Sequence, residues 1–590
     1  MLQSTAAPGF LSRQRTVAGP GFNRWLTPPA ALAIHLCIGM IYGFSVFWLP
    51  LSKAIGVTTA KTCPADMGLF AEAFARDCDW KVGSLTWTFT LAIVFLGSSA
   101  AVFGHWLETA GPRKAGIASA FCWCGGLLIS ALGVYLHQLW LIWLGSGVIG
   151  GIGLGLGYIS PVSTLIKWFP DRRGMATGLA IMGFGGGAMI GAPLANYLMA
   201  YFTSSTPSAP LNAVFERLAT PNEVGVWQTF VALALIYFVF MLSGAFGYRV
   251  PRDGWTPAGW MPPADADNAM VTHRHVHLET SWRTPQFWLL WGVLCMNVSA
   301  GIGVLSMASP MLQEVFGGRL IGQDIGFDSL SAAQRTQVAA IAAGFTGLLS
   351  LCNIFGRIGW ASFSDRLGRK LTYAIFFLLG GVLYAFAPAA ARAGMLAAFV
   401  LAFSVILTMY GGGFSTIPAY LADLFGTHMV GAIHGRLLTA WSTAGVVGPW
   451  LVTSFRERQL AAGTPREAVY DQTMYVLVGL LVVGLVCDLL VRPVASKHFM
   501  TDEELAAEKK TTVAAVRHEE EETHADFEDF EEEEREGSAV AGAARIGPGR
   551  VAPRLRLGGA LVMGLAWLAV GTPLAWGVCV TLQKTAAMFH

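Results

Sequence analysis

The sequence predicts an all-α integral membrane protein with two six-helix halves and one additional C-terminal membrane helix. Three observations support this prediction. Of the 590 residues, 54% are hydrophobic and 13% are charged, whereas a soluble globular domain has about 25% charged residues. Apolar runs of about 20 residues, the length that crosses a bilayer, recur along the chain. Short motifs of the first half return at matching places in the second half.

The apolar runs form two groups of six, joined by a polar connection rich in proline and tryptophan. Lys and Arg collect in alternate loops, and by the positive-inside rule these loops and the N-terminus are cytoplasmic. The expected spans cover 28–50, 83–105, 115–137, 140–162, 174–200, 226–248, 286–312, 336–360, 371–391, 394–418, 430–454 and 471–492. The basic loops contain Arg113/Lys114, Lys167/Arg172/Arg173, Arg249/Arg252, Arg366/Arg369/Lys370 and Arg492/Lys497.

The region after the twelfth span changes in character. Residues 501–536 contain long acidic runs, which are typical of a solvated cytoplasmic tail. A second apolar run follows, and we expect it to be a thirteenth span with a structural role that leaves the C-terminus outside. The expected organisation is a cytoplasmic N-terminal segment (1–27), an N-terminal half (28–248), a cytoplasmic linker (249–285), a C-terminal half (286–492), an acidic cytoplasmic segment (493–556) and a thirteenth helix (557–581).

Two loops carry the clearest internal repeat. The loop after the second span reads GHWLETAGPRK, and the loop after the eighth reads ASFSDRLGRK. Each has a carboxylate, Glu108 or Asp365, then a glycine three residues on and a pair of basic residues. The fourth and tenth spans end in YISP and STIP, and each is followed by two glycines spaced by four residues, Gly174/Gly178 and Gly431/Gly435. Such repetition is how secondary transporters with a central site are built.

These motifs carry a resemblance to a known family. The paired loops resemble the signature of the major facilitator superfamily, with Glu108 in place of the usual Asp, Pro112 inserted and Ala361 in place of the leading Gly. The runs 153–193 and 35–51 resemble the oxalate/formate antiporter family, whose bacterial members move small carboxylates. The resemblance covers residues 25 to about 495 and implies the major facilitator fold.

Arg357 is the residue that points most directly to a substrate. It lies eight residues before Asp365, which is about 12 Å along a helix. If Asp365 marks the membrane surface, Arg357 lies near mid-bilayer, where a charge is expensive and usually functional. Its planar guanidinium binds a carboxylate with two hydrogen bonds. We therefore expect it to bind an anion; a structural pairing to carbonyl groups is the alternative.

The resemblance adds a second expectation about the substrate. In the oxalate-exchanging members, an arginine of the eighth span and a lysine of the eleventh clamp the dicarboxylate. Arg357 occupies the matching arginine position, but Trp441 stands where the lysine would be. The resemblance therefore implies a monocarboxylate such as formate, lactate or pyruvate rather than oxalate.

Other candidate binding residues lie in the spans that line the cavity in this superfamily. His35 lies about two turns into the first span and changes its charge near physiological pH, so it could carry a proton or bind the substrate; a neutral, hydrogen-bonded histidine is the alternative. Aromatic side chains can donate to a carboxylate while excluding water, although packing is their commoner role. The aromatic candidates are Tyr42, Tyr158, Tyr410 and Trp441, with Trp48 in the same set of spans.

The charged loop residues are predicted to form gates rather than binding sites. This gating set comprises Glu108, Arg113, Lys114, Asp365, Arg366, Arg369 and Lys370. Cys63 and Cys78 share one polar loop and could pair if it faces an oxidising compartment, or remain free thiols. The histidines of 273–277 are an unpromising metal site, and Cys122 and Cys124 are expected to be packing residues.

The sequence as a whole predicts a monomeric carrier of small carboxylate anions, of the formate, lactate, pyruvate or oxalate type. It would work by alternating access in the bilayer of the inner (plasma) membrane, as an exchanger or a proton symporter. No nucleophile–base pair predicts an enzyme, and no cofactor or nucleic-acid partner is implied. The alternatives are a carrier of an uncharged solute, against which Arg357 argues, and a membrane sensor that signals through the acidic tail.

Overall fold

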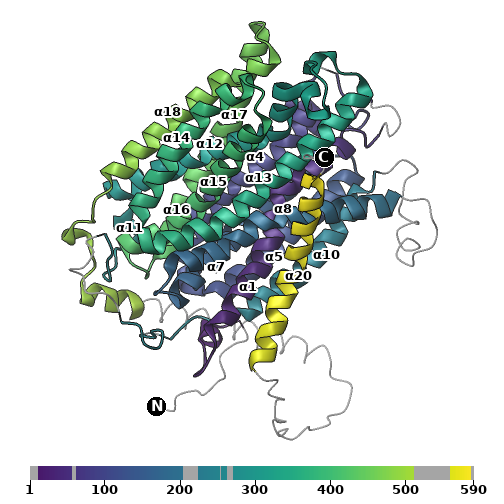
Figure 1. The fold of residues 1–590 in the computed structure, drawn as a ribbon. Coiled ribbons are helices and arrows are strands. Elements are labelled where there is room, and N and C mark those ends of the chain that lie inside the picture. The colour runs from purple at the N-terminus through teal and green to yellow at the C-terminus, as the bar shows by residue number, and fades with distance from the viewer. Residues whose placement is uncertain are drawn as a thin grey trace, which may run out of the picture.

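Each expected span corresponds to a helix or to consecutive helical segments in the computed structural model (Figure 1). The structure describes residues 11–55, 61–64, 66–203, 224–252, 254–261, 270–510 and 559–586. The acidic runs of the expected tail lie outside these residues. Only the beginning of the tail is described, where 502–510 is helical.

The first half contains six spans. They are α1 with η3 and α2 (Thr27–Ile38, Gly39–Phe47, Trp48–Leu51), α4 (Val82–Ala110), α5 (Pro112–Tyr135), α6 with η4 and α7 (Leu139–Ile142, Trp143–Ile149, Gly150–Trp168), α8 (Arg173–Thr203) and α10 (Val226–Gly247).

The second half repeats the arrangement, and one helix follows it. Its spans are α12 (Pro285–Phe316), α13 (Ala332–Leu367), α14 (Arg369–Arg392), α15 (Leu396–Phe425), α16 with α17 (Val430–Leu437, Thr439–Ala461) and α18 (Asp471–Leu490), and the extra helix is α20 (Gly559–Ala586). The shorter elements are η1 (Arg13–Thr16), η2 (Arg24–Leu26), α3 (Leu69–Phe74), α11 (Leu278–Ser281), η5 (Gly317–Ile321), η6 (Phe327–Ser329), η7 (Arg466–Ala468) and η8 (Ser496–His498).

Twelve helices of the described residues are long and apolar enough to cross a membrane, and α20 is one of them. The expected eleventh span, α16 with α17, is not among the twelve. Serine, threonine, glycine and tryptophan lower the mean hydropathy of α17. A turn at Leu438 also interrupts the helix between α16 and α17. With this span included, the structure has the predicted twelve spans and the extra helix.

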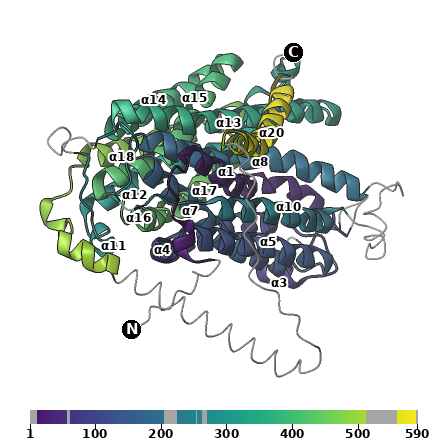
Figure 2. The ribbon, with the colours of Figure 1, turned by 90° about the horizontal axis from the view of Figure 1, so that it is seen from below.

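Helix α20 lies against the bundle rather than apart from it. In both ribbon views it runs along the outside of the bundle beside α8 (Figures 1 and 2), and it packs on α13, α8 and α1. Val570 is buried with Met182 and Met189 of α8 and with Leu351 and Ile354 of α13. Because α8 and α13 belong to different halves, α20 covers the seam between them.

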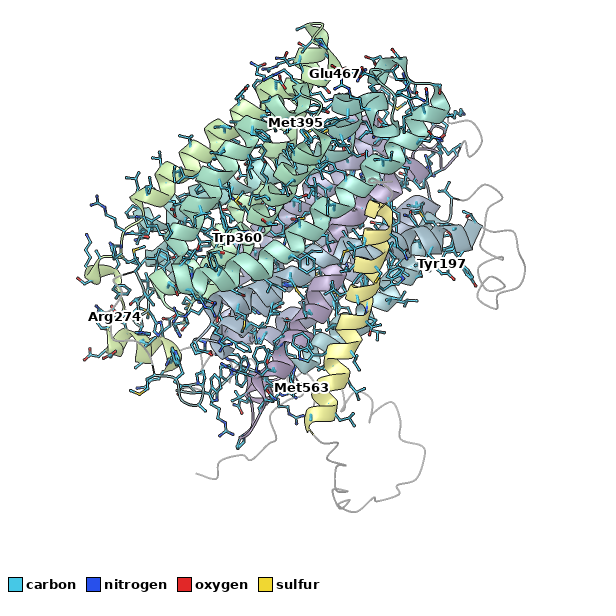
Figure 3. All side chains as sticks on the ribbon, in the orientation of Figure 1. Tyr197, Arg274, Trp360, Met395, Glu467 and Met563 are labelled. Atoms are coloured by element: carbon cyan, nitrogen blue, oxygen red, sulfur yellow. A yellow bond between two sulfur atoms is a disulfide. The ribbon has the colours of Figure 1, made fainter. Side chains whose placement is uncertain are left out.

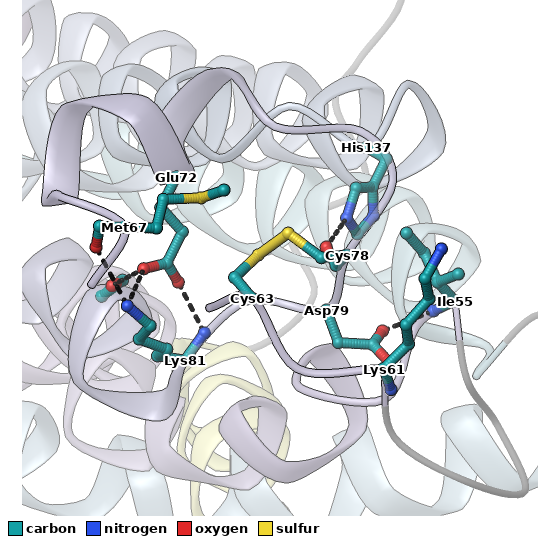
Figure 4. Close-up of a disulfide and its surroundings, with 10 residues drawn as sticks. Ile55, Lys61, Cys63, Met67, Glu72, Cys78, Asp79, Lys81 and His137 are labelled. Carbon is teal, nitrogen blue, oxygen red and sulfur yellow. Dashed lines mark hydrogen bonds and ion pairs between the residues drawn. A yellow bond between two sulfur atoms is a disulfide. The ribbon is translucent and has the colours of Figure 1, made fainter. Parts of the chain in front are cut away.

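The two ends of the bundle differ in chemistry. One end, which we call the basic face, carries the loops predicted to be cytoplasmic; Arg274 lies there, and Glu467 lies at the opposite end (Figure 3). The opposite end carries the loop between α2 and α4, in which Cys63 and Cys78 form a disulfide (Figure 4). Asp79 accepts hydrogen bonds from the backbone N–H groups of Ile55 and Lys61, each 2.7 Å long. The sequence had left this pairing open.

Candidate functional site

Arg357 is fully buried in the middle of α13, with 0% of its surface exposed. Its Nε donates to Asn353 Oδ1 at 3.1 Å, one turn earlier on the same helix. Its Nη1 donates to the backbone carbonyl of Ile181 on α8 at 2.9 Å. Nη2 has no hydrogen-bond partner, and among the residues that the structure describes the guanidinium forms no ion pair. The charge is therefore held in place by neutral groups, with one donor nitrogen free.

A glycine of α8 makes room for this guanidinium. A Cβ on Gly185 would lie 2.9 Å from Arg357 Nε, closer than real Cβ contacts allow. The position one turn before Gly185 is Ile181, whose carbonyl accepts from the same arginine. The glycine-rich stretch of α8 therefore positions Arg357 by letting the side chain pack directly on the helix backbone.

Aromatic rings from four helices and η3 surround Arg357. The arginine Cζ lies 5.4 Å from the ring centroid of Phe414 on α15. Trp441 of α17 is central to this aromatic cluster, with its ring centroid 4.7 Å from that of Phe414, 5.1 Å from that of Tyr158 and 5.3 Å from that of Phe184. The aromatic cluster comprises Tyr42 of η3, Tyr158 of α7, Phe184 of α8, Tyr410 and Phe414 of α15 and Trp441 of α17.

The polar atoms of this cluster lack protein partners. In the described part of the chain, the hydroxyls of Tyr42, Tyr158 and Tyr410 and Trp441 Nε1 are buried and find no hydrogen-bond partner, although the great majority of buried polar side-chain atoms have one. The Tyr42 hydroxyl lies near Tyr410, Trp441 and Arg357 without reaching hydrogen-bond geometry with any of them. Together with Arg357 Nη2, these groups offer several donors and one permanent positive charge. That chemistry suits a small anion with several acceptor atoms.

His35 reaches this site through Tyr158. Its Nδ1 contacts the backbone carbonyl of Ala180, and its Nε2 lies 3.2 Å from the carbonyl of Tyr158. Both contacts are carbonyl oxygens, which only accept hydrogen bonds. A neutral imidazole donates through one nitrogen only, so the neutral ring can donate to just one of the two carbonyls. Its centroid is 5.3 Å from that of Tyr158. All six predicted binding residues thus lie together, with His35 linked to the others through the Tyr158 ring.

Four further residues of the site were not singled out in the sequence. Asn353, Phe184 and Phe414 contact Arg357 or Trp441, as described above. His434 of α16 is buried, and its ring centroid lies 5.9 Å from that of Tyr158. One feature of the sequence could have indicated that His434 belongs to the site. It lies seven residues before Trp441, which is about two helical turns. Asn353 had a comparable signal, because it is a polar residue four positions before Arg357 in the same apolar run, whereas Phe184 and Phe414 lie in long apolar stretches and carry none.

Two carboxylates of the repeated loops join the halves at the basic face. Asp365 of α13 accepts hydrogen bonds from the backbone N–H groups of Gly174 and Met175, at 2.8 and 2.9 Å, where α8 begins. Glu108 of α4 accepts from the N–H of Gly431 at 3.0 Å, where α16 begins. Each carboxylate therefore caps a helix of the other half, and the negative charge is stabilised at the positive end of that helix. We call this pair the crossed caps.

Ion pairs reinforce the crossed caps. Asp423 of α15 pairs with Arg173 at 2.9 Å, across the two halves, and with Arg369 at 3.0 Å. Arg369 also pairs with Asp365 at 2.6 Å, and Lys167 pairs with Glu108 at 2.6 Å. The sequence did not single out Asp423, because its partners lie in distant parts of the chain.

The predicted gating residues therefore divide into two groups. Glu108, Asp365 and Arg369 lie in the network between the halves. Lys370 donates to the carbonyls of Leu489 and Val491, within its own half. Of the remaining members, Arg113 donates to the carbonyl of Arg15, Lys114 is partly buried, and Arg366 is exposed.

A cavity of about 670 Å³ opens beside this network at the basic face. Cations predominate among its charged lining residues, which include Arg13, Lys167 and Lys509. His275 also lines it, and burial together with the nearby His428 and Lys509 lowers the pKa of His275 to about 4. Among the described residues, no group of three His, Cys, Asp or Glu is arranged to hold a metal ion. The histidines of 273–277 thus lie at a basic surface.

The chain is similar to known membrane carriers over most of its length. It is 25% identical over 457 residues to the apicoplast pyruvate carrier 1 of Toxoplasma gondii, covering 70% of this chain and 80% of that one. It is 24% identical over 437 residues to the oxalate:formate antiporter of Oxalobacter formigenes, covering 72% and 83%. The crystal structure of the transporter FucP in the outward conformation has the same fold, with a TM-score of 0.50 at 13% identity, covering 79% of this chain and 99% of that one.

The family model for the Major Facilitator Superfamily matches residues 33–449, which is more than half of the chain. This range includes both repeated loops, the crossed caps and all six predicted binding residues. The members of this family are transporters rather than enzymes. The chain therefore belongs to the Major Facilitator Superfamily and is a multi-pass membrane transporter.

Proposed function

We propose that this transporter moves small carboxylate anions, of the formate, lactate, pyruvate or oxalate type, by alternating access to the site around Arg357. The observation that carries the proposal is the buried guanidinium of Arg357, which has a free Nη2 and unpartnered tyrosine hydroxyls around it. A permanent charge inside a membrane bundle is costly unless it has a partner. A bound carboxylate would be that partner, and the names of the relatives in Toxoplasma gondii and Oxalobacter formigenes point to the same class of anion.

The orientation follows from the two ends of the bundle. The basic loops favour the cytoplasmic side, and disulfides persist in oxidising compartments, so the Cys63–Cys78 disulfide favours the opposite side. We propose a monomer in the inner (plasma) membrane with a cytoplasmic N-terminus. In this orientation, the crossed caps close the cytoplasmic side. Exchange and proton-coupled symport are both compatible with such a carrier.

Arg357→Gln tests the anion anchor. Removing one partner of a buried charge pair costs about 2 kcal/mol or more, which is at least about a thirtyfold loss of affinity at 1.4 kcal/mol per decade. Uptake of labelled formate, lactate, pyruvate and oxalate into proteoliposomes, with and without internal counter-substrate, measures the effect. Arg357→Lys is expected to recover only part of the affinity, because the planar fork is lost. Wild-type affinity in the Gln variant would rule out Arg357 as the anchor.

Gly185→Ala tests the position of Arg357 without changing its charge. The new Cβ would displace Nε, and overpacking of this kind costs about 1–3 kcal/mol, so we expect weaker substrate binding in a folded protein. Gly186→Ala is the matched control, because the nearest atoms to its Cβ are the ends of flexible side chains, Leu574 Cδ1 at 3.0 Å and Leu36 Cδ2 at 3.4 Å. Equal affinities in the two variants would contradict the positioning role of Gly185.

Asp365→Asn tests the gate. The substitution removes the charge that caps α8 and pairs with Arg369, so the closed basic face should lose stability. We expect the transport rate to fall by a larger factor than the substrate affinity measured from one side. Asp324→Asn is the control, because that carboxylate is 86% exposed in its ion pair with Arg319. An affinity loss as large as that of Arg357→Gln would assign Asp365 to the binding site instead.

Trp441→Lys tests the preference between one and two carboxylates. A dianion at Arg357 would leave its second carboxylate beside the Trp441 ring without a permanent cation. Burying an unpaired charge costs several kcal/mol, so in the wild type monocarboxylates should bind at least about a hundredfold more tightly than oxalate. In Trp441→Lys the preference should move toward oxalate. Competition assays at fixed pH measure both, and equal wild-type affinities for oxalate and formate would mean that another cation serves the site.

A further inference from the structure

His434 is a buried histidine without hydrogen bonds. It lies in α16, the short first part of the eleventh span, and 1% of its surface is exposed. Among the residues that the structure describes, neither Nδ1 nor Nε2 has a hydrogen-bond partner. A buried imidazole with both nitrogens unpaired is unusual, since buried polar groups are nearly always hydrogen-bonded. Its nitrogens are therefore free to take a partner that is present only during part of the transport cycle.

The position of His434 connects the aromatic cluster with the crossed caps. Its ring centroid lies 5.9 Å from that of Tyr158, which contacts Trp441 in turn. Three residues before it, the N–H of Gly431 donates to Glu108 in the closed network. His434 therefore lies between the site around Arg357 and the basic face, along the direction in which the site would open when the crossed caps separate.

Most of the other titratable groups around α16 are engaged, and the hydroxyl of Tyr158 is the main exception. His35 of α1, whose charge would act electrostatically on His434, lies between two backbone carbonyls. Tyr158 of α7 is the other neighbouring group, and its hydroxyl is free. On the remaining elements packed against α16, every carboxylate except the exposed Glu457 of α17 has a partner among the described residues. The pairs are Glu108 of α4 with Lys167 of α7, Asp423 of α15 with Arg173 and Arg369, Glu279 of α11 with Arg436 of α16 itself, and Glu314 of α12 with Arg456 of α17 at the opposite end of the bundle.

We propose that His434 carries the proton that accompanies the carboxylate, which makes the protein an electroneutral proton–carboxylate symporter. This inference rests on the proposed function. The proton comes from water on the side to which the site is open and adds to the lone pair of one imidazole nitrogen. It returns to water on the other side when the anion leaves, and no other bond changes.

Charge balance explains why the proton and the anion travel together. In the empty site Arg357 is positive, and its charge opposes an imidazolium in the same low-dielectric interior. A bound carboxylate offsets the arginine, so the anion favours protonation, and by reciprocity the proton favours anion binding. The loaded site with its proton then has the same net charge as the empty site. Both forms can therefore pass through the closed state with the same net buried charge of one positive unit, and the net charge moved is zero.

His434→Gln in the full chain tests the inference, with three measurements in proteoliposomes. These are uptake of labelled lactate driven by an inward proton gradient at zero potential, exchange of lactate at equal pH, and proton entry reported by a trapped pH-sensitive dye. The wild type is expected to move protons with net uptake. In His434→Gln we expect the ratio of proton-driven uptake to exchange to fall at least tenfold, with the dye signal lost. His105→Gln is the control, because His105 of α4 is exposed.

The outcomes separate the inference from the proposed function. Lactate exchange without proton entry in the wild type would overturn the role of His434 and leave the carboxylate carrier standing. Proton-driven uptake that persists in His434→Gln, or that is lost in His35→Gln alone, would assign the proton to another group. If no carboxylate crosses by either mode in the wild type, both proposals fail. The wild-type dye measurement decides whether a proton accompanies the anion, and His434→Asn takes the place of the Gln variant if that variant does not fold.

Discussion

The arrangement of the bundle depends on the two carboxylates that cap helices of the opposite half. Glu108 fixes the beginning of α16, and Asp365 fixes the beginning of α8. Those two helices then carry the neighbours of the central site: α8 brings Ile181 to Arg357, and α16 brings His434 to Tyr158. A change at the crossed caps would therefore be transmitted to groups that contact the site, because the same two helices carry both.

Glycine at the capped ends makes this contact close. A Cβ on Gly174 would lie 2.1 Å from the carbonyl oxygen of Ala361, and one on Gly435 would lie 2.2 Å from that of Ala100. Each pair of glycines spaced by four residues thus lets one helix pack on the backbone of a helix from the other half. Small residues allow such close packing in membranes, and backbone contacts that lack interlocking side chains can separate and re-form.

The sequence predicts the spans well and the site only in part. Long apolar runs define the helices, and the spacing from Asp365 correctly predicts that Arg357 is buried deep in α13. The crossed caps were not predictable, because Glu108 and Gly431 are 323 residues apart and meet only in the folded bundle. His434 lies in GAIHGRL, a segment that ends where the eleventh span is interrupted. The segment is too short for the spacing of its apolar residues to predict which side of the helix faces the site. The pairing of Cys63 with Cys78 likewise depends on how the loop folds around Asp79.

The seam between α8 and α13 joins the cap at Asp365 and the proposed anion site at Arg357 in one antiparallel contact. Asp365 accepts a hydrogen bond from Gly174 at one end of the seam. Arg357, eight residues earlier on α13, donates to Ile181, which lies seven residues later on α8. The two contacts are therefore about 12 Å apart along α13. An anion at Arg357 would compete with the Ile181 carbonyl for the guanidinium, and would thereby weaken the seam at the point nearest the site. Separation at the basic face would in turn pull that carbonyl away from the arginine. Helix α20 packs across the same two helices through Val570, so any such motion must also be accommodated by the thirteenth helix.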